Sequence, residues 1–184
     1  VAALTAMGNV EPQLKVHIHA ALNVGCNIAE IQEVILQMSA YSGFPSSING
    51  MIALKEVLEV RRAEGKKDKN GTIQSSPIPE YTTRYEFGSE KINMLNKNQA
   101  ELLEKEFKDV SPDIAKFIIE YGFSDILSRP ALDLKHREIA TIAALTAMGN
   151  AISQLKFHIK AGLNIGISQA EIREVMILMS VYSG

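Results

Sequence analysis

The chain has 184 residues and a formal net charge of −2, with acidic and basic side chains mixed along its length. This balance gives no positive surface of the kind that binds nucleic acid or an anionic membrane, so we expect neither partner. A single cysteine excludes an internal disulfide and a CxxC pair, and no apolar run has the length of a membrane span. The composition therefore favours a soluble, cytoplasmic protein in a reducing compartment.

A duplication organises the sequence. Residues 1–43 and 142–184 align without a gap, and 27 of the 43 aligned positions are identical. A repeat of this length that occurs twice indicates two copies of one domain rather than a solenoid. We expect a first repeat over residues 1–62, a linker over residues 63–82 and a second repeat over residues 83–184. Each copy is incomplete at one end, the first at its front and the second at its back.

Helical patterns follow one another through the first repeat. Residues 1–8 have the pattern of a helix end that stops at Gly8-Asn9, and a second helix begins near Pro12. Asn27 and Glu30 form a capping pair that opens a third helix. Pro45 stands in the first turn of a fourth helix, where proline is tolerated.

The linker and the second repeat continue this organisation. Residues 61–79 are polar, punctuated by glycine and proline, and without periodicity, so we expect a mobile linker. Two short helices are predicted between Tyr85 and Phe107, followed by a helix from Ser111-Pro112 to Phe123 and a long helix that Asp133 caps. No stretch alternates as a β-strand does, so the predicted fold class is all-α.

Two polar residues of the second repeat are spaced so that they can meet. Glu138 precedes the turn at Gly149-Asn150 by 11 residues and His158 follows Gly149 by 9, which puts both at a similar level on antiparallel helices. Each lies on an apolar stripe, where an ionised group needs a partner. A carboxylate bound to an imidazole in a dry cleft can act in acid/base chemistry. The alternative is a core histidine, with Glu138 paired to Arg137 or Lys135.

The first repeat carries a histidine at the same position. His17 aligns with His158, whereas the position that aligns with the carboxylate would precede Val1. Two further carboxylates recur, Glu33 and Glu174. Because both lie near the beginning of a helix, where the macrodipole favours a negative charge, we assign them no chemical role.

Several stretches resemble one known family. The runs are HREIATIAALTAMGN, QLKFHIKAGLNIG and SQAEIREVMILMSVYSG, together with FPSSINGM of the first repeat. They resemble the carboxymuconolactone decarboxylase family, which belongs to the alkylhydroperoxidase D-like superfamily, over most of residues 1–60 and 85–184. The resemblance implies a duplicated alkylhydroperoxidase D-like helical domain that assembles into a homo-oligomer, a trimer or a hexamer.

The resemblance also implies an activity. A protein of this family would decarboxylate a small cyclic (lactone) acid without a cofactor, so its partner would be a small-molecule carboxylate. His158, and His17 in the other repeat, would donate the proton, with Glu138 as the orienting partner. Arg137 would hold the substrate carboxylate, and Asn49, in a Pro-x-x-x-Asn stretch, would lie at the pocket edge.

Two other functions remain open at this point. The peroxidase branch of the superfamily has a CxxC motif before its histidine, but Ala151 and Gln154 stand at those positions here, so the thiol pair for peroxide reduction is missing. A peroxidase-type oxidoreductase that uses Cys26 or an external thiol is one alternative. A non-enzymatic helical assembly domain is the other. No cluster of His, Cys and Asp has metal-ligand spacing, so we expect no bound metal.

Overall fold

The computed structural model describes residues 1–74 and 78–183, and in this part of the chain every regular element is a helix. The predicted first repeat contains α1 (Ala2–Met7), α2 (Glu11–Asn23), α3 (Ile28–Gln37), the short 3₁₀ helix η1 (Met38–Ala40) and α4 (Gly43–Ala63). The predicted second repeat contains α5 (Arg84–Leu95), α6 (Gln99–Phe107), α7 (Pro112–Phe117), the π-helical segment η2 (Ile118–Leu127), α8 (Leu134–Met148), α9 (Ile152–Asn164) and α10 (Gln169–Ser183). The predicted all-α class is confirmed.

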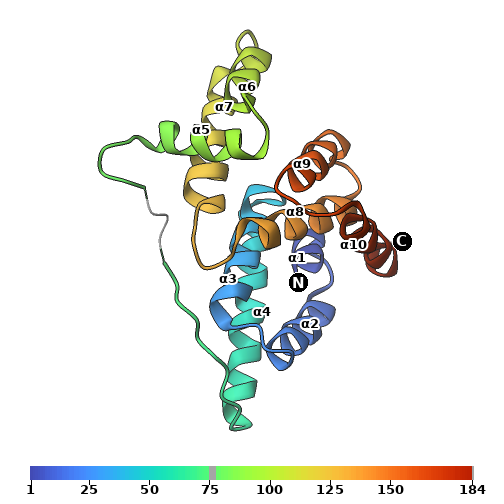
Figure 1. The fold of residues 1–184 in the computed structure, drawn as a ribbon. Helices are drawn as coiled ribbons and strands as arrows, with labels where there is room; N and C mark the ends of the chain where they lie inside the picture. Colours follow the sequence, from blue (N-terminus) through green and yellow to red (C-terminus); the bar gives the residue numbers. More distant parts are fainter. Residues whose placement is uncertain (75–77, 184) are drawn as a thin grey trace.

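The two repeats pack against each other through the segment that is duplicated. The sequence ALTAMG ends α1 in the first repeat and α8 in the second. These two helices lie side by side near the centre of the molecule (Figure 1). Small side chains allow the close approach, because the buried cluster at this interface is made of Ala2, Ala6, Ala140 and Ala144 with Met38. The interface between the repeats is thus built from small side chains of both helices.

The helices α5, α6, α7 and η2 form a separate lobe, drawn at the top of Figure 1. Gly88 lets α5 approach η2 closely, since a Cβ atom there would lie 2.2 Å from the carbonyl oxygen of Ile119. The core of the lobe also receives Leu36 from α3 and Phe157 from α9. The lobe is therefore fixed to both repeats, and the space between it and α9 becomes the pocket described below.

The segment after Ser111-Pro112 is longer than predicted and changes its helical type. The sequence predicts one helix that ends at Phe123, whereas the structure continues to Leu127 and is π-helical from Ile118 onward. π-Helical turns are uncommon and are found frequently at functional sites. Here the π-helical segment lines the pocket.

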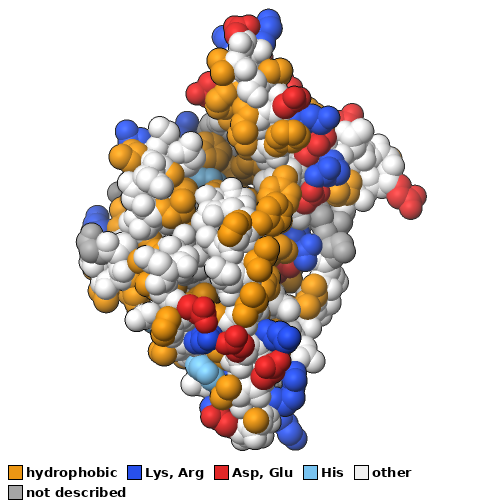
Figure 2. All heavy atoms as spheres, turned by 180° about the vertical axis from the view of Figure 1, so that it is seen from behind, with side chains coloured by type: hydrophobic (Ala, Val, Ile, Leu, Met, Phe, Trp, Pro, Cys, Tyr) orange, Lys and Arg blue, Asp and Glu red, His pale blue; other side chains and the backbone are white. Residues whose placement is uncertain are grey.

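The long helix α4 covers α2 and α3 of the first repeat. Its inward side buries Leu54 and Val57 in the core of that repeat. Its outward side leaves Phe44, Ile48 and Ile52 exposed. Figure 2 shows a column of hydrophobic side chains on the rear face of the molecule. The first repeat thus has a complete core and an apolar outer stripe on one helix.

The first part of the linker is held against the first repeat. The carbonyl oxygens of Lys69 and Asn70 accept hydrogen bonds of 2.9 Å from the backbone N–H groups of Ile28 and Ala29. These N–H groups belong to the first turn of α3, where intrahelical partners are lacking. The expectation of a mobile linker is therefore wrong for this part. Residues 75–77 of the predicted linker, and Gly184 at the end of the second repeat, lie outside the described residues.

Candidate active site

Glu138 and His158 meet between α8 and α9. The Asp133 side chain accepts a hydrogen bond from the N–H of His136 and so caps α8, which ends at Gly149 with a φ of 68°. The turn that follows makes α9 antiparallel to α8, and Oε2 of Glu138 lies 2.8 Å from Nδ1 of His158. Glu138 is fully buried and His158 is 5% exposed. The two side chains that the spacing brings to one level are thus in contact, and their roles in a reaction stay a prediction.

The contact leaves one atom of each side chain for other partners. Because Glu138 engages Nδ1, the ring nitrogen of His158 that remains for a ligand is Nε2. The second carboxylate oxygen of Glu138, Oε1, is buried and has no hydrogen-bond partner among the described residues. Buried oxygens without a partner are rare in native proteins, and they accompany a catalytic role or an ordered water. Nε2 of His158 and Oε1 of Glu138 are therefore the two atoms of the pair that can bind a water or a ligand.

A pocket of about 520 Å³ opens beside His158. Most of its wall is apolar, from Leu103, Phe107, Phe117, Ile118, Phe123 and Phe157. Its polar side chains are Tyr41, Gln99, Glu106, Tyr121, Ser153, Gln154 and His158, and no lysine or arginine is among the described residues that line it. The rear view of Figure 2 shows a hollow below the upper lobe, with hydrophobic side chains and a histidine in it. An apolar pocket with a few convergent polar groups is typical of a small-molecule site.

The first repeat supplies one wall of this pocket. The ring of Tyr41 lies edge-on to His158, with the ring centroids 5.3 Å apart and the planes at 78°. The hydroxyl oxygens of Ser39 and Tyr121 are 2.6 Å apart. Burial, and after it the Glu138 carboxylate, raise the pKa of the Tyr41 hydroxyl. This hydroxyl is therefore a proton-bearing group at neutral pH.

Arg137 is held inside the protein, away from this pocket. The guanidinium donates hydrogen bonds to Glu33 (2.8 Å) and Gln37 (3.1 Å) of α3, and to the backbone carbonyls of Arg129 and Leu132. Burial lowers the pKa of the guanidinium, and the Glu33 carboxylate opposes this effect. Because all three guanidinium nitrogens are engaged, the geometry does not support the predicted clamp for a substrate carboxylate. Arg137 instead ties α3 to α8.

Glu33 forms long-range ion pairs that the sequence does not indicate. Its carboxylate binds both Arg129 and Arg137, and it is only 2% exposed. Its counterpart Glu174 is exposed. The interpretation that the helix macrodipole explains both residues is wrong for Glu33. The two arginines lie 96 and 104 residues further along the chain, so no local pattern could identify them as partners.

The remaining predicted site residues lie elsewhere. His17, on α2, packs edge-on against Tyr182, with the ring centroids 5.1 Å apart. Asn49 is exposed on α4. Neither lines the pocket beside His158. The structure thus brings together two of the five predicted site residues and leaves three outside the pocket.

Other pocket residues were not predicted. Gln154 precedes His158 by one helical turn and lines the pocket. The signal for it is the i, i+4 spacing, since residues four apart share a helix face. Tyr41 and Tyr121 have no comparable signal, because they reach the site from elements distant in the sequence.

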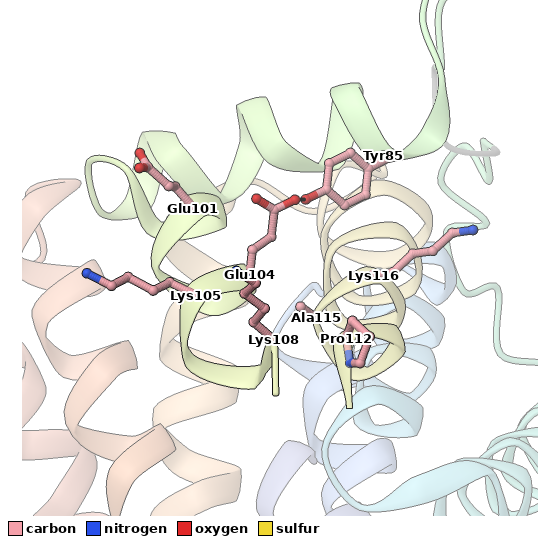
Figure 3. Close-up of a pocket in the computed structure, with 8 residues that line it drawn as sticks. All are labelled: Tyr85, Glu101, Glu104, Lys105, Lys108, Pro112, Ala115 and Lys116. Atoms are coloured by element: carbon pink, nitrogen blue, oxygen red, sulfur yellow. Dashed lines mark hydrogen bonds between the residues drawn. The ribbon is translucent and has the colours of Figure 1, made fainter. Parts of the chain in front are cut away.

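A second depression, of about 470 Å³, lies between α5, α6 and α7. In Figure 3 the Lys105 and Lys116 side chains point outward on opposite sides, whereas the Tyr85 hydroxyl meets the Glu104 carboxylate. The described residues that line it include no histidine, cysteine or buried carboxylate. We therefore place the candidate active site in the pocket beside His158.

Three further features bear on function. Among the described residues, no three His, Cys, Asp or Glu side chains are grouped so that they could hold a metal ion. Over the same residues, none of the helices combines the length and the apolar character needed to cross a membrane. Cys26, on which the peroxidase alternative depends, is exposed between α2 and α3 and does not line the pocket.

Comparison with known proteins identifies the family. The model of the carboxymuconolactone decarboxylase family matches residues 1–56 and 112–184, more than half of the chain. A 4-carboxymuconolactone decarboxylase from Acinetobacter baylyi is 29% identical over 102 residues, which are 55% of this chain and 75% of that protein. A nitrosuccinic acid decarboxylase from Metarhizium robertsii is 30% identical over 69 residues, 38% of this chain and 48% of that protein. The matched segments fall in the two repeats, and the chain belongs to the carboxymuconolactone decarboxylase family.

Proposed function

We propose that the protein is a decarboxylase of a small organic acid, with His158 as the proton donor and Glu138 as its orienting partner. The observation that carries this proposal is the 2.8 Å contact between the buried carboxylate and Nδ1 of an imidazole that lines an apolar pocket. Family membership supports the reaction class, and so do the two relatives that are named as decarboxylases.

The pair suits the proton transfer that follows loss of CO₂. The bond between the substrate carboxylate and its neighbouring carbon breaks, and the electron pair stays on that carbon, delocalised into an adjacent electron-withdrawing group. His158, protonated on Nε2, donates its proton to this carbon, and solvent later restores the proton. Glu138 stabilises the imidazolium through Nδ1 and fixes the ring, as an orienting carboxylate does in other acid/base pairs. The scheme is redox-neutral and uses no cofactor.

The apolar lining of the pocket favours a reaction in which the substrate loses its negative charge. The substrate is an anion and the product CO₂ is neutral, so an apolar wall disfavours the reactant more than the product. In place of the predicted Arg137 clamp, we propose that the positive charge facing the substrate is the imidazolium of His158. Gln154 is a neutral group whose side-chain amide can donate hydrogen bonds to the substrate oxygens.

The assembly stays a prediction. We propose that residues 1–62 and 83–184 are the two repeat domains and that the chain forms a homo-oligomer, a trimer or a hexamer. The apolar stripe of Phe44, Ile48 and Ile52 on α4 is exposed surface that a second copy can cover. Light scattering of the Ile48→Asp protein tests this, because a charge in a subunit contact is expected to lower the molar mass. An unchanged mass places the contact elsewhere.

The reaction is tested by measuring CO₂ release from 4-carboxymuconolactone and from nitrosuccinic acid. We expect His158→Gln to lower kcat by about 10²- to 10⁴-fold, the usual contribution of a general acid. His17→Gln removes the equivalent imidazole outside the pocket and is expected to leave kcat within about twofold of the original value.

Full turnover in a folded His158→Gln protein would show that the proton donor is another group. The peroxidase alternative has its own measurement, thiol-dependent consumption of hydrogen peroxide. Peroxide consumption that disappears in a Cys26→Ser protein would favour that alternative.

A further inference from the structure

We propose that both repeats build the His158 site, and that Tyr41 of the first repeat is a positioning residue for the His158 imidazole as well as a wall of the substrate pocket. The catalytic consequence rests on the proposed function. The positioning itself rests on the contacts between the two side chains.

Three contacts hold the His158 ring. Glu138 of α8 engages Nδ1 at 2.8 Å. The ring of Phe157, the preceding residue of α9, lies edge-on at 5.0 Å and 84°. Tyr41 lies edge-on at 5.3 Å and 78°, and it is the contact that comes from the other repeat. Edge-to-face contacts of this kind are favourable aromatic arrangements. Together with the hydrogen bond they fix the ring rotation, and therefore the direction in which Nε2 points.

The Glu138 charge also acts on the Tyr41 hydroxyl. Burial, and after it this charge, oppose the ionisation of the hydroxyl and raise its pKa. Oε1 of Glu138 is buried without a hydrogen-bond partner among the described residues. The direct contact of Tyr41 with the pair is therefore the edge-on contact with the His158 ring.

The same contact occurs a second time with the repeats exchanged. Tyr182 is the counterpart of Tyr41, and His17 is the counterpart of His158. The rings of Tyr182 and His17 are 5.1 Å apart at 80°, almost the geometry of the first pair. Each histidine therefore receives the tyrosine of the other repeat. This reciprocity shows that the contact follows from the way in which α1 and α8 pair the repeats.

Other contacts between the repeats hold this wall of the pocket in place. Ser39, two residues before Tyr41, meets the hydroxyl of the pocket residue Tyr121. On the same segment, Gln37 donates to Thr141 of α8 at 2.7 Å. The wall is therefore anchored to the second repeat on both sides of Met38. It follows that a single repeat in isolation lacks part of the site, and that the duplication supplies it within one chain.

The positioning is tested on the full chain by NMR of ¹⁵N-labelled histidine, with the His158 signals assigned from a His158→Gln protein. Tyr41→Leu is expected to shift the signals of the His158 ring nitrogens, because the ring loses its edge-on contact, and to leave the His17 signals in place. Tyr182→Leu is the matched control and should do the reverse. Unchanged His158 signals in a folded Tyr41→Leu protein would overturn the proposal. If that protein does not fold, Tyr41→Met carries the same test, because it also removes the aromatic ring, and unshifted His158 signals would equally overturn the proposal.

Kinetics test the catalytic consequence. For CO₂ release, Tyr41→Leu is expected to lower kcat by about 10- to 100-fold, since a small misplacement of a catalytic group has an effect of this size. The Tyr41→Phe protein keeps the aromatic ring, so it should have most of the original kcat and nearly the original KM. The Tyr182→Leu protein should have an unchanged kcat. A Tyr41→Leu protein with full kcat would show that the ring orientation does not matter. Shifted His158 signals in a protein that decarboxylates neither acid would instead count against the proposed reaction and leave the positioning intact.

Discussion

The two repeats present the same helix faces but bury them to different extents. In the first repeat α4 covers α2, so Ile18 is 0% and Leu22 is 7% exposed. In the second repeat Ile159 is half-buried and Leu163 is 40% exposed. Among the described residues, no helix covers α9 as α4 covers α2. The same apolar stripe is therefore core in one repeat and partly surface in the other, because tertiary neighbours decide burial.

The polar positions show the same contrast. His158 has a buried carboxylate and a pocket beside it, whereas its counterpart His17 has neither among the described residues. Glu33 is surrounded by arginines of the other repeat, whereas its counterpart Glu174 is exposed. The duplication has thus kept residue types at positions whose surroundings differ. Paired substitutions at equivalent positions measure how much of each residue's role comes from those surroundings.

The largest difference is expected between Glu33→Gln and Glu174→Gln. Removing the Glu33 charge leaves Arg137 fully buried without its anionic partner, and such a loss is expected to lower the free energy of unfolding by about 3–5 kcal/mol. Glu174→Gln changes an exposed side chain and is expected to stay within about 0.5 kcal/mol of the original stability.

Urea denaturation of the two variants gives this comparison directly. Equal effects would mean that Arg137 finds another partner when Glu33 is changed. In that case the ion pairs between the repeats would contribute little to the pairing of α3 with α8.

The local part of the site could be predicted from the sequence. The turn at Gly149-Asn150 sets the register of α8 against α9. The regular period of a helix then decides which side chains of each helix lie on the facing sides. The spacing therefore predicts that Glu138 and His158 can meet, although it leaves open a pairing of Glu138 with Arg137 or Lys135. The same holds for the caps at Asn27 and Asp133, whose hydrogen bonds form within one turn of the chain.

The long-range part could not be predicted in this way. Tyr41 reaches His158, and Glu33 reaches Arg137, only because the two repeats pair through α1 and α8. A single sequence does not encode the docking angle of two domains in any local period. The family resemblance implies a substrate role for Arg137, whereas the structure gives it a partner 104 residues away.

A smaller difference is expected between Ile18→Val and Ile159→Val. Removing one methylene from the fully buried Ile18 leaves a cavity under α4 and should lower the free energy of unfolding by about 1 kcal/mol. Ile159 is half-buried, so the same change should have roughly half that effect. The midpoints of denaturant unfolding give both losses of stability, provided that the unfolding free energy of each variant depends on denaturant concentration with the same slope. A larger effect at Ile159 would indicate that a partner covers α9 in solution.

The smallest effect concerns the pH dependence of stability. Burial is the main cause that lowers the pKa of His17 below its ordinary 6.5. An imidazole whose pKa is lower in the folded than in the unfolded state binds fewer protons when folded, so its contribution is unfavourable at acidic pH and vanishes above about 6.5. The free energy of unfolding should therefore fall as the pH drops from 7.5 toward 5.5, and His17→Gln should reduce that fall.

Comparing the original protein with the His17→Gln protein isolates the contribution of His17, because the other three histidines are present in both. Unfolding curves in urea at the two pH values measure it. If His17→Gln leaves the pH dependence unchanged, the His17 imidazole is as well hydrated in the folded as in the unfolded chain. The packing of Tyr182 against it would then not shield it from water, although the ring contact is present.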